Sequence, residues 1–275
     1  MAAPAGFTVH PRSGQYLLLE KGTGSLLKTV VFQMPTKMGK GILVTPTYHG
    51  NLLIGPDALD QENADRSTDV QRLAAIYKQA LMATPQLDIT KFIRSFAGVR
   101  AVASTDDFIV QMGDTSGFIN VAGIQSPGLT SSPAIADRVA KLVRQAGVRL
   151  LPNPDYNPRR RPIITPQEPL PAKEAARLAA LPPGPNRLVC RCEQVAQQVI
   201  EDSLRRGIPV TTVDGVKRRT RASMGLCQGA FCRPRFIEII QREYGITVDG
   251  LTDPQREGIK RVTKQQLLDY LKNQP

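Results

Sequence analysis

Four cysteines in the second half of the chain have the types and spacing to do chemistry. Cys190 and Cys192 form a Cys-x-Cys pair, and after 34 further residues Cys227 and Cys232 form a Cys-x4-Cys pair. Four thiolates in two close pairs can converge on a single metal centre. Each pair stands beside a segment with helical periodicity, so the second half of the chain must supply the elements that position the sulfurs.

Three kinds of site compete for these cysteines. Disulfides are disfavoured because the N-terminal residues lack the basic start and apolar core of an export signal, and a reducing compartment keeps thiols free. A structural zinc ion accepts four thiolates, but zinc sites favour Cys-x2-Cys spacing at both ends. A 2Fe-2S cluster tolerates unequal spacing, so we prefer it and predict that all four cysteines are its ligands.

Basic residues gather around the cysteines. The net charge is +12, and residues 151–275 hold 21 basic and 13 acidic side chains, against 15 and 11 in residues 1–150. A 2Fe-2S centre with four thiolates carries a net charge of about −2, or about −3 when reduced, so its burial needs positive neighbours or amide donors. We expect that role, or else a solvated helix face, for Arg191, Lys217, Arg218, Arg219, Arg221, Arg233 and Arg235.

Composition and proline content define the organisation of the chain. The 275 residues are 41% apolar and 22% charged, with no apolar run near the ~18 residues of a membrane span, so membrane-spanning and wholly disordered proteins are excluded. Ten of the 22 prolines lie between Pro152 and Pro185. We therefore predict a domain over 1–150, a connector over 151–186 with a short helix at 173–180, a domain over 187–245 and a C-terminal helical extension over 246–275.

Hydrophobic periodicity predicts an α+β fold. In the first domain we expect strands at 15–19, 30–33, 41–47, 51–55, 108–112 and 118–124. Helices are expected at 69–82, capped by Ser67 or Thr68, and from Ser132-Pro133 to about Gly147. The small second domain is expected to be all-helical, with helices at 193–206, 213–221 and 235–244, and a capped helix follows at 263–271.

The cysteine motifs resemble a known family. Leu188-Val-Cys-Arg-Cys-Glu193 and Thr220-Arg-Ala-Ser-Met-Gly-Leu-Cys-Gln-Gly-Ala-Phe-Cys232 are similar to the 2Fe-2S domain related to bacterioferritin-associated ferredoxin. The resemblance covers roughly residues 187–245. In that family the domain is often the C-terminal part of flavin-dependent dehydrogenases, notably the large subunit of anaerobic glycerol-3-phosphate dehydrogenase.

The first half resembles the substrate domain of the same enzymes. The similar segments are Pro11-Arg-Ser-Gly-Gln-Tyr-Leu-Leu-Leu19, Gly39-Lys-Gly-Ile-Leu-Val-Thr-Pro-Thr-Tyr-His-Gly-Asn-Leu-Leu-Ile-Gly-Pro56 and Ser95-Phe-Ala-Gly-Val-Arg100. The resemblance implies part of a D-amino-acid oxidase-like flavoprotein, with mostly antiparallel sheet and helices in 1–150. It also implies FAD as a second cofactor.

A strand, a glycine-containing loop and a proline-started helix end this first domain. Such a segment presents free amides and the positive end of a helix dipole, which suits the negative charge of reduced flavin. An ordinary strand-turn-helix connection is the alternative. The segment Gly123-Ile-Gln-Ser-Pro-Gly-Leu-Thr-Ser-Ser-Pro-Ala-Ile-Ala136 resembles the closing flavin-binding segment of the family, and the contacts this implies are Gly123, Ile124, Ser126, Pro127, Gly128, Leu129 and Thr130.

Two side chains are candidates for substrate chemistry. His49, one of two histidines, lies beside Gly50 between two predicted strands and could accept a hydroxyl proton. Arg100 follows Gly98 and could hold a phosphate or carboxylate in a forked contact, as the arginine in this context does in related flavoproteins. The alternatives are a satisfied turn histidine and a surface ion-pair arginine.

The sequence departs from the family pattern at the dinucleotide-binding motif. Gly22-Thr-Gly24 and Gly39-Lys-Gly41 do not complete a G-x-G-x-x-G, so independent FAD binding and complete catalysis are open, and the chain could be a fragment or half of a split enzyme. We predict the C-terminal part of an FAD-dependent oxidoreductase of the glycerol-3-phosphate type. It would act on a small anionic substrate and pass electrons from flavin through the cluster to an electron-acceptor protein or flavoprotein subunit.

Two other functions compete with this prediction. The first is a non-catalytic 2Fe-2S electron carrier or complex subunit that requires a separate flavoprotein chain. The second is a zinc-containing protein that binds nucleic acid, which is weakly supported because aromatic residues make up 5% and Trp is absent. We expect no nucleic-acid partner, no membrane span and a cytoplasmic location, with any membrane association made through a partner.

Overall fold

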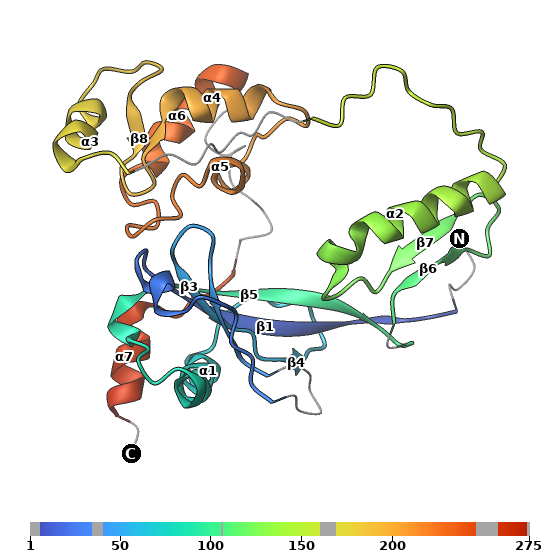
Figure 1. Cartoon of the computed structure of the whole chain (residues 1–275), viewed down its shortest axis with the longest axis horizontal. Helices are drawn as coiled ribbons and strands as arrows, with labels where there is room; N and C mark the ends of the chain where they lie inside the picture. Colours follow the sequence, from blue (N-terminus) through green and yellow to red (C-terminus); the bar gives the residue numbers. More distant parts are fainter. Residues whose placement is uncertain (1–5, 35–40, 106, 160–168, 246–257, 274–275) are drawn as a thin grey trace.

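A computed structural model describes residues 6–34, 41–105, 107–159, 169–245 and 258–273 (Figure 1). Residues 160–168 of the predicted connector and 246–257 of the predicted C-terminal extension lie outside the described residues. Helices and antiparallel strands together give the predicted α+β class. No helix among the described residues is both long enough and apolar enough to cross a bilayer.

The first part of the chain forms a five-stranded antiparallel sheet. The long central strand is β1 (Val9–Leu19), which pairs with β5 (Phe92–Ala103) along its whole length and with β3 (Leu52–Gly55) and β4 (Leu59–Asp60) on its other side. The edge strand β2 (Leu43–Pro46) pairs with β3. The predicted strand at 30–33 is reduced to a single bridge between Val31 and Val44, beside a short 3₁₀ helix η1 (Thr23–Leu26).

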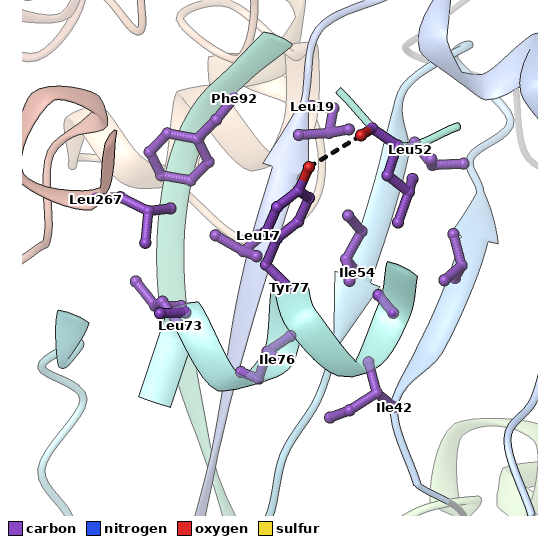
Figure 2. Close-up of a cluster of buried hydrophobic side chains, with 14 residues drawn as sticks. Leu17, Leu19, Ile42, Leu52, Ile54, Leu73, Ile76, Tyr77, Phe92 and Leu267 are labelled. Carbon is purple, nitrogen blue, oxygen red and sulfur yellow. Dashed lines mark hydrogen bonds between the residues drawn. The ribbon is translucent and has the colours of Figure 1, made fainter. Parts of the chain in front are cut away.

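One face of this sheet is covered by two helices, α1 (Val70–Ala83) and α7 (Lys264–Lys272) (Figure 1). Successive side chains of a strand point to opposite faces, so alternate residues of β1 such as Leu17 and Leu19 enter this apolar core. Figure 2 shows Leu17, Leu73, Phe92 and Leu267 gathered there. The core therefore unites segments from both ends of the chain.

Helix α1 has a different cap from the one predicted. The side chain of Asp69, not Ser67 or Thr68, accepts the hydrogen bond from the amide of Arg72 (2.9 Å). The Thr68 hydroxyl instead accepts from the Val262 amide (2.8 Å) and so helps to hold the segment before α7 against the sheet. The connection from α1 to β5 ends in the 3₁₀ helix η2 (Ile89–Lys91).

The opposite face of the sheet, called the outer face below, is lined by cross-strand pairs of β1 and β5. Directly opposed residues of antiparallel strands share a face, and the stacked rings of Tyr16 and Phe96, with centroids 4.9 Å apart, show this for one pair. From one end to the other the pairs are Leu18–Arg94, Tyr16–Phe96, Gly14–Gly98 and Arg12–Arg100.

A hairpin and a long helix follow β5. The strands β6 (Ile109–Met112) and β7 (Ile119–Ala122) pair as predicted, and α2 (Gly128–Gln145) packs on them. The predicted start at Ser132-Pro133 is wrong, because α2 begins at Gly128 and Pro133 lies inside it. A proline lacks the amide that would bond to the carbonyl four residues earlier; here the Ser132 hydroxyl donates to that Leu129 carbonyl instead (2.8 Å).

The cysteine-bearing part of the chain is a separate small unit with its own core. It contains α4 (Gln197–Arg205), α5 (Val213–Thr220) and α6 (Arg233–Tyr244), preceded by α3 (Ala172–Ala179). It is not all-helical, since β8 (Leu188–Cys190) and β9 (Val195–Ala196) form a short antiparallel ribbon where a helix from 193 was predicted. Its core packs the helices together through Ile200, Val216, Phe236 and Ile240.

The buried contact of α7 with the sheet gives the first testable prediction. Leu267 is 0% exposed, so Leu267→Ala should lower the free energy of unfolding by about 2–5 kcal/mol through lost burial and a residual cavity. Leu129→Ala, at a position 91% exposed, is the matched control and should change it by no more than about 0.5 kcal/mol. Urea unfolding measures both, and equal small changes would contradict the packing of α7 described above.

Candidate functional site

The four cysteines lie together at one end of the small unit. Cys190 ends β8, Cys192 follows it in the turn to β9, Cys227 lies in the loop after α5, and Cys232 is the N-cap residue of α6. All four are free thiols; Cys190 and Cys232 are buried, whereas Cys192 and Cys227 are half-buried. The ribbon and the start of α6 therefore bring the two sequence motifs together.

The thiols form two close pairs, each of which takes one cysteine from each motif. A hydrogen bond between the thiols of Cys190 and Cys232 lowers the pKa of Cys190 to about 6 and raises the pKa of Cys232 above its ordinary value. A second hydrogen bond joins Cys192 and Cys227. Burial, assisted by that bond, raises the pKa of Cys192.

Backbone amides supply the other donors to these sulfurs. The amide of Ser223 donates to Sγ of Cys190 (3.5 Å). Burial alone would raise the pKa of Cys227, but hydrogen bonds from the amides of Gly229 and Phe231 outweigh it and lower that pKa. Ser223 and Gly229 have φ values of 68° and 97°, and these left-handed residues turn the loop around the thiols.

The predicted compensation by Lys and Arg side chains takes a different form. Arg219 donates to the backbone carbonyls of Ser203, Arg206 and Ile208 and so ties α5 to the end of α4. Arg218 pairs with Asp214 (3.5 Å). Among the described residues the donors found on the cysteine sulfurs are amides and thiols, which stabilise thiolates without a neighbouring formal charge.

This donor set fits a two-iron cluster. Such a cluster has two thiolates on each of its irons and accepts hydrogen bonds at sulfur, and the structure offers two thiol pairs with amide donors. Within the residues that the structure describes, no three or more Cys, His, Asp or Glu side chains are grouped closely enough to hold one metal ion. The geometry is thus one of two pairs, not of a single four-thiolate group.

Two polar contacts join the cysteine loops to the sheet unit, Glu193 with Lys21 and Gln228 with Arg94, and none of these four residues is a predicted site residue. Glu193, next to Cys192, pairs with Lys21 (3.1 Å) and with Arg221 (2.9 Å). Gln228, next to Cys227, accepts from Arg94 of β5 (2.8 Å). Their position next to Cys192 and Cys227 is the sequence feature that could have identified Glu193 and Gln228, because the residue after each of these half-buried cysteines contacts the other unit.

His49 lies in the turn between β2 and β3, where the Thr47 carbonyl accepts from the Gly50 amide (2.9 Å). Its pKa is lowered from the ordinary value by burial first and then by the charge of Arg221, while Glu193 opposes the shift. The imidazole therefore faces the charged residues beside the cysteine loops and is neutral at pH 7.

Arg100 lies at the other end of the outer face. Its guanidinium donates to the carbonyl of Asp57 (3.2 Å), and no carboxylate pairs with it among the described residues, so the ion-pair alternative is not seen. Arg100 is opposite Arg12 on β1, whereas the side-chain amide of Asn51, two residues after His49, donates to the Leu19 carbonyl (2.9 Å). Seven residues of strand, roughly 20 Å, separate those positions, so His49 and Arg100 do not form one site.

The predicted flavin-binding segment lies at the Arg100 end. Gly123 packs so closely on Ala103 of β5 that a Cβ there would lie 2.6 Å from the Ala103 Cβ. A Cβ on Gly128, the first residue of α2, would lie 2.4 Å from Ile124. The turn needs both glycines, and it presents the exposed first turn of α2, including Leu129 and Thr130, whose amides have no acceptor inside the helix. This fits an anionic edge of a flavin.

An antiparallel sheet with a helix-terminus site, joined to a small domain with paired thiols, defines a two-module redox protein. Residues 1–142 match the family described as FAD dependent oxidoreductase, and residues 188–242 match the BFD-like [2Fe-2S] binding domain. The chain belongs to the FAD-dependent oxidoreductase family and carries a BFD-like 2Fe-2S domain. Both predicted cofactor classes are thereby confirmed.

Individual relatives agree with this assignment. A glycerol 3-phosphate dehydrogenase of Caloramator mitchellensis is 45% identical over 238 residues, which cover 86% of this chain and 49% of the relative. A reduced L-α-glycerophosphate oxidase of Mycoplasma pneumoniae with FAD bound superposes with a TM-score of 0.50 at 34% identity, over 55% of this chain and 40% of the oxidase. Subunit A1 of an anaerobic glycerol-3-phosphate dehydrogenase of Haloferax volcanii is 43% identical over 60 residues, 22% of this chain and 10% of the subunit. The chain spans about half or less of the length of these relatives.

The paired thiols give the second prediction. Purified protein should contain about two irons and about two acid-labile sulfides per chain. Either Cys190→Ser or Cys232→Ser should remove most of the iron and sulfide, because each removes one thiol of the Cys190–Cys232 pair. Ala230→Ser, an exposed change in the same loop, is the control and should retain them. Colourless protein with about one zinc per chain would contradict the cluster.

Proposed function

We propose that this chain is the C-terminal part of an FAD-dependent dehydrogenase of the glycerol-3-phosphate type, which passes electrons from flavin through the 2Fe-2S cluster to a partner protein. One observation carries the proposal: the same sheet face bears Arg100 at one end and contacts the cysteine loops at the other. The chemistry supplied there would be hydride acceptance by a bound flavin and one-electron transfer by a bound cluster. The identity to the Caloramator dehydrogenase supports the substrate class.

Arg100 is the residue to which we assign the substrate's anionic group. One of its nitrogens bonds to the Asp57 carbonyl, which fixes the guanidinium and leaves its other donors for a phosphate or carboxylate. Asp57 is itself held by Arg72 through two bonds of 2.7 and 2.9 Å. The anchor is therefore rigid, which favours the forked contact that a mobile surface arginine would make less well.

Gly98 gives the room for the substrate. A Cβ at this position would meet nothing within 4 Å, so the outer face is open between Phe96 and Arg100. Across the strand, Gly14 leaves the space that the Arg100 guanidinium occupies, since a Cβ there would lie 2.8 Å from it. The first turn of α2 would hold the flavin at this end through Gly123, Ile124, Ser126, Pro127, Gly128, Leu129 and Thr130.

The thiol pairs suggest how the cluster is held. Cys190 with Cys232 would bind one iron and Cys192 with Cys227 the other, in keeping with the hydrogen-bonded pairs. The second pair lies next to Glu193 and Gln228, which contact the sheet unit. The Haloferax relative is named as a subunit, which supports a protein as the electron acceptor.

The catalytic part of the proposal is tested by flavin reduction. When the chain is assembled with the dinucleotide-binding part of the enzyme and FAD, glycerol 3-phosphate should bleach the flavin anaerobically. Arg100→Gln should raise the KM about tenfold or more because a charged contact is lost. Gly98→Val should lower kcat/KM by at least about tenfold while leaving the unfolding free energy unchanged or higher, because its Cβ fills open space without a clash.

Arg205→Gln is the control for these variants, since Arg205 pairs with the exposed end of α6 through Glu243, far along the chain from Arg100. It should keep wild-type kinetics. An assembled protein that holds the cluster but binds no FAD and shows no bleaching would contradict the catalytic proposal and leave the electron-carrier function.

A further inference from the structure

A cavity of about 450 Å³ lies between the outer face of the sheet and α5. The sheet contributes Leu18, Leu53, Arg94 and Phe96, and the small unit contributes residues of α5 and of the loop that leads to Cys227. Its volume is in the range of small-molecule sites. Neither the four cysteines nor Arg100 line it.

Cations dominate the charged lining. Of the charged side chains around the cavity that belong to described residues, one is the carboxylate Asp214, and the other six are Arg66, Arg94, Lys217, Arg218, Arg221 and Arg261. They come from four separate segments: the loop before α1, strand β5, α5 with its following residue, and the segment before α7. Like charges brought together by the fold repel one another unless an anion lies between them.

The arginines that line the cavity differ in their hydrogen-bond and ion-pair partners. Arg94 donates to Gln228, and Arg218 and Arg221 pair with Asp214 and Glu193, so these guanidiniums are held in place. Nε of Arg261 is buried and has no hydrogen-bond partner among the described residues. A buried donor without an acceptor, on the wall of a cationic cavity, is a group that an oxygen of a bound ligand would satisfy.

The remaining lining narrows the class of ligand. Phe96, Met224 and Ile259 provide apolar surface beside the cations. Guanidinium forks match the oxygens of a phosphate, and an aromatic ring with a thioether suits a flat or apolar group attached to it. A phosphate ester with a planar base of nucleotide size satisfies both parts, whereas a bare ion uses only the first.

We propose that this cavity is a second anion site, which binds a small phosphate ester and bridges the sheet unit and the cluster domain. The ligand phosphate would lie among Arg94, Lys217 and Arg218, with Arg261 as a further donor. Because its contacts come from both units, the ligand would hold the cysteine loops on the sheet. The proposal does not rest on glycerol 3-phosphate oxidation, since Arg100 lies six strand residues from Arg94 at the other end of the outer face.

Calorimetric titration of the cluster-loaded protein at low ionic strength, with inorganic phosphate, AMP and succinate as probes, tests the site. We expect saturable binding of phosphate, tighter binding of AMP because the apolar lining contributes, weaker binding of succinate, and competition between AMP and phosphate. The double variant Lys217→Gln/Arg218→Gln should weaken AMP binding about tenfold or more and reduce its salt dependence. Iron content and far-UV circular dichroism establish that the variant is folded.

Two controls locate the binding. Arg205→Gln removes a cation outside the cavity, and Arg100→Gln removes the one assigned to the substrate, so neither should change the affinity for AMP. Absence of saturable binding up to about 10 mM AMP, equal affinity in the double variant and wild type, or loss of binding in Arg100→Gln would each overturn the proposal. AMP binding that persists in protein unable to oxidise glycerol 3-phosphate would leave this site standing and the proposed function refuted.

Discussion

The antiparallel pairing of β1 with β5 is the constraint on which the rest of the structure depends. Its register runs from Val9 opposite Ala103 to Leu19 opposite Phe92, and a shift by one residue would move every side chain to the other face. In the observed register Leu17 and Leu19 are buried under α1, which leaves Arg94 and Arg100 on the outer face. Burial of the apolar residues thus decides on which face these two arginines lie.

The two ends of the outer face have different surroundings. At the Arg100 end, Gly98 leaves open backbone and Gly14 makes room for a fixed guanidinium, close to the turn that begins α2. At the Arg94 end, the face is covered by the cluster domain, which is attached through Gln228 and Glu193. The continuous pairing of β1 with β5 fixes the position of one end relative to the other.

Several features could be predicted from the sequence because their causes are local. The helices at 70–83 and 264–272 have clear apolar periodicity, and Gly245 ends α6 as expected of a left-handed glycine. The cysteine spacing and the flanking residues carried the cluster prediction, which the matched domain confirms. The start of α2 was missed because Pro133 usually marks a first turn, whereas here the Ser132 hydroxyl replaces the missing amide inside the helix.

What the sequence could not give is long-range placement. His49 and Arg100 each suit the same substrate by residue type, but only the strand register shows that the turn of His49 lies beside the Leu19 end of β1 whereas Arg100 lies beside Arg12. The basic residues of α5 are predicted to compensate the negative charge of the cluster because they are near the cysteines in sequence. In the fold a helix turns successive residues to different sides, so Arg219 caps carbonyls of the α4 end while Lys217 and Arg218 face the sheet. Some basic residues of the second half therefore stabilise the small unit itself, and others lie where that unit meets the sheet.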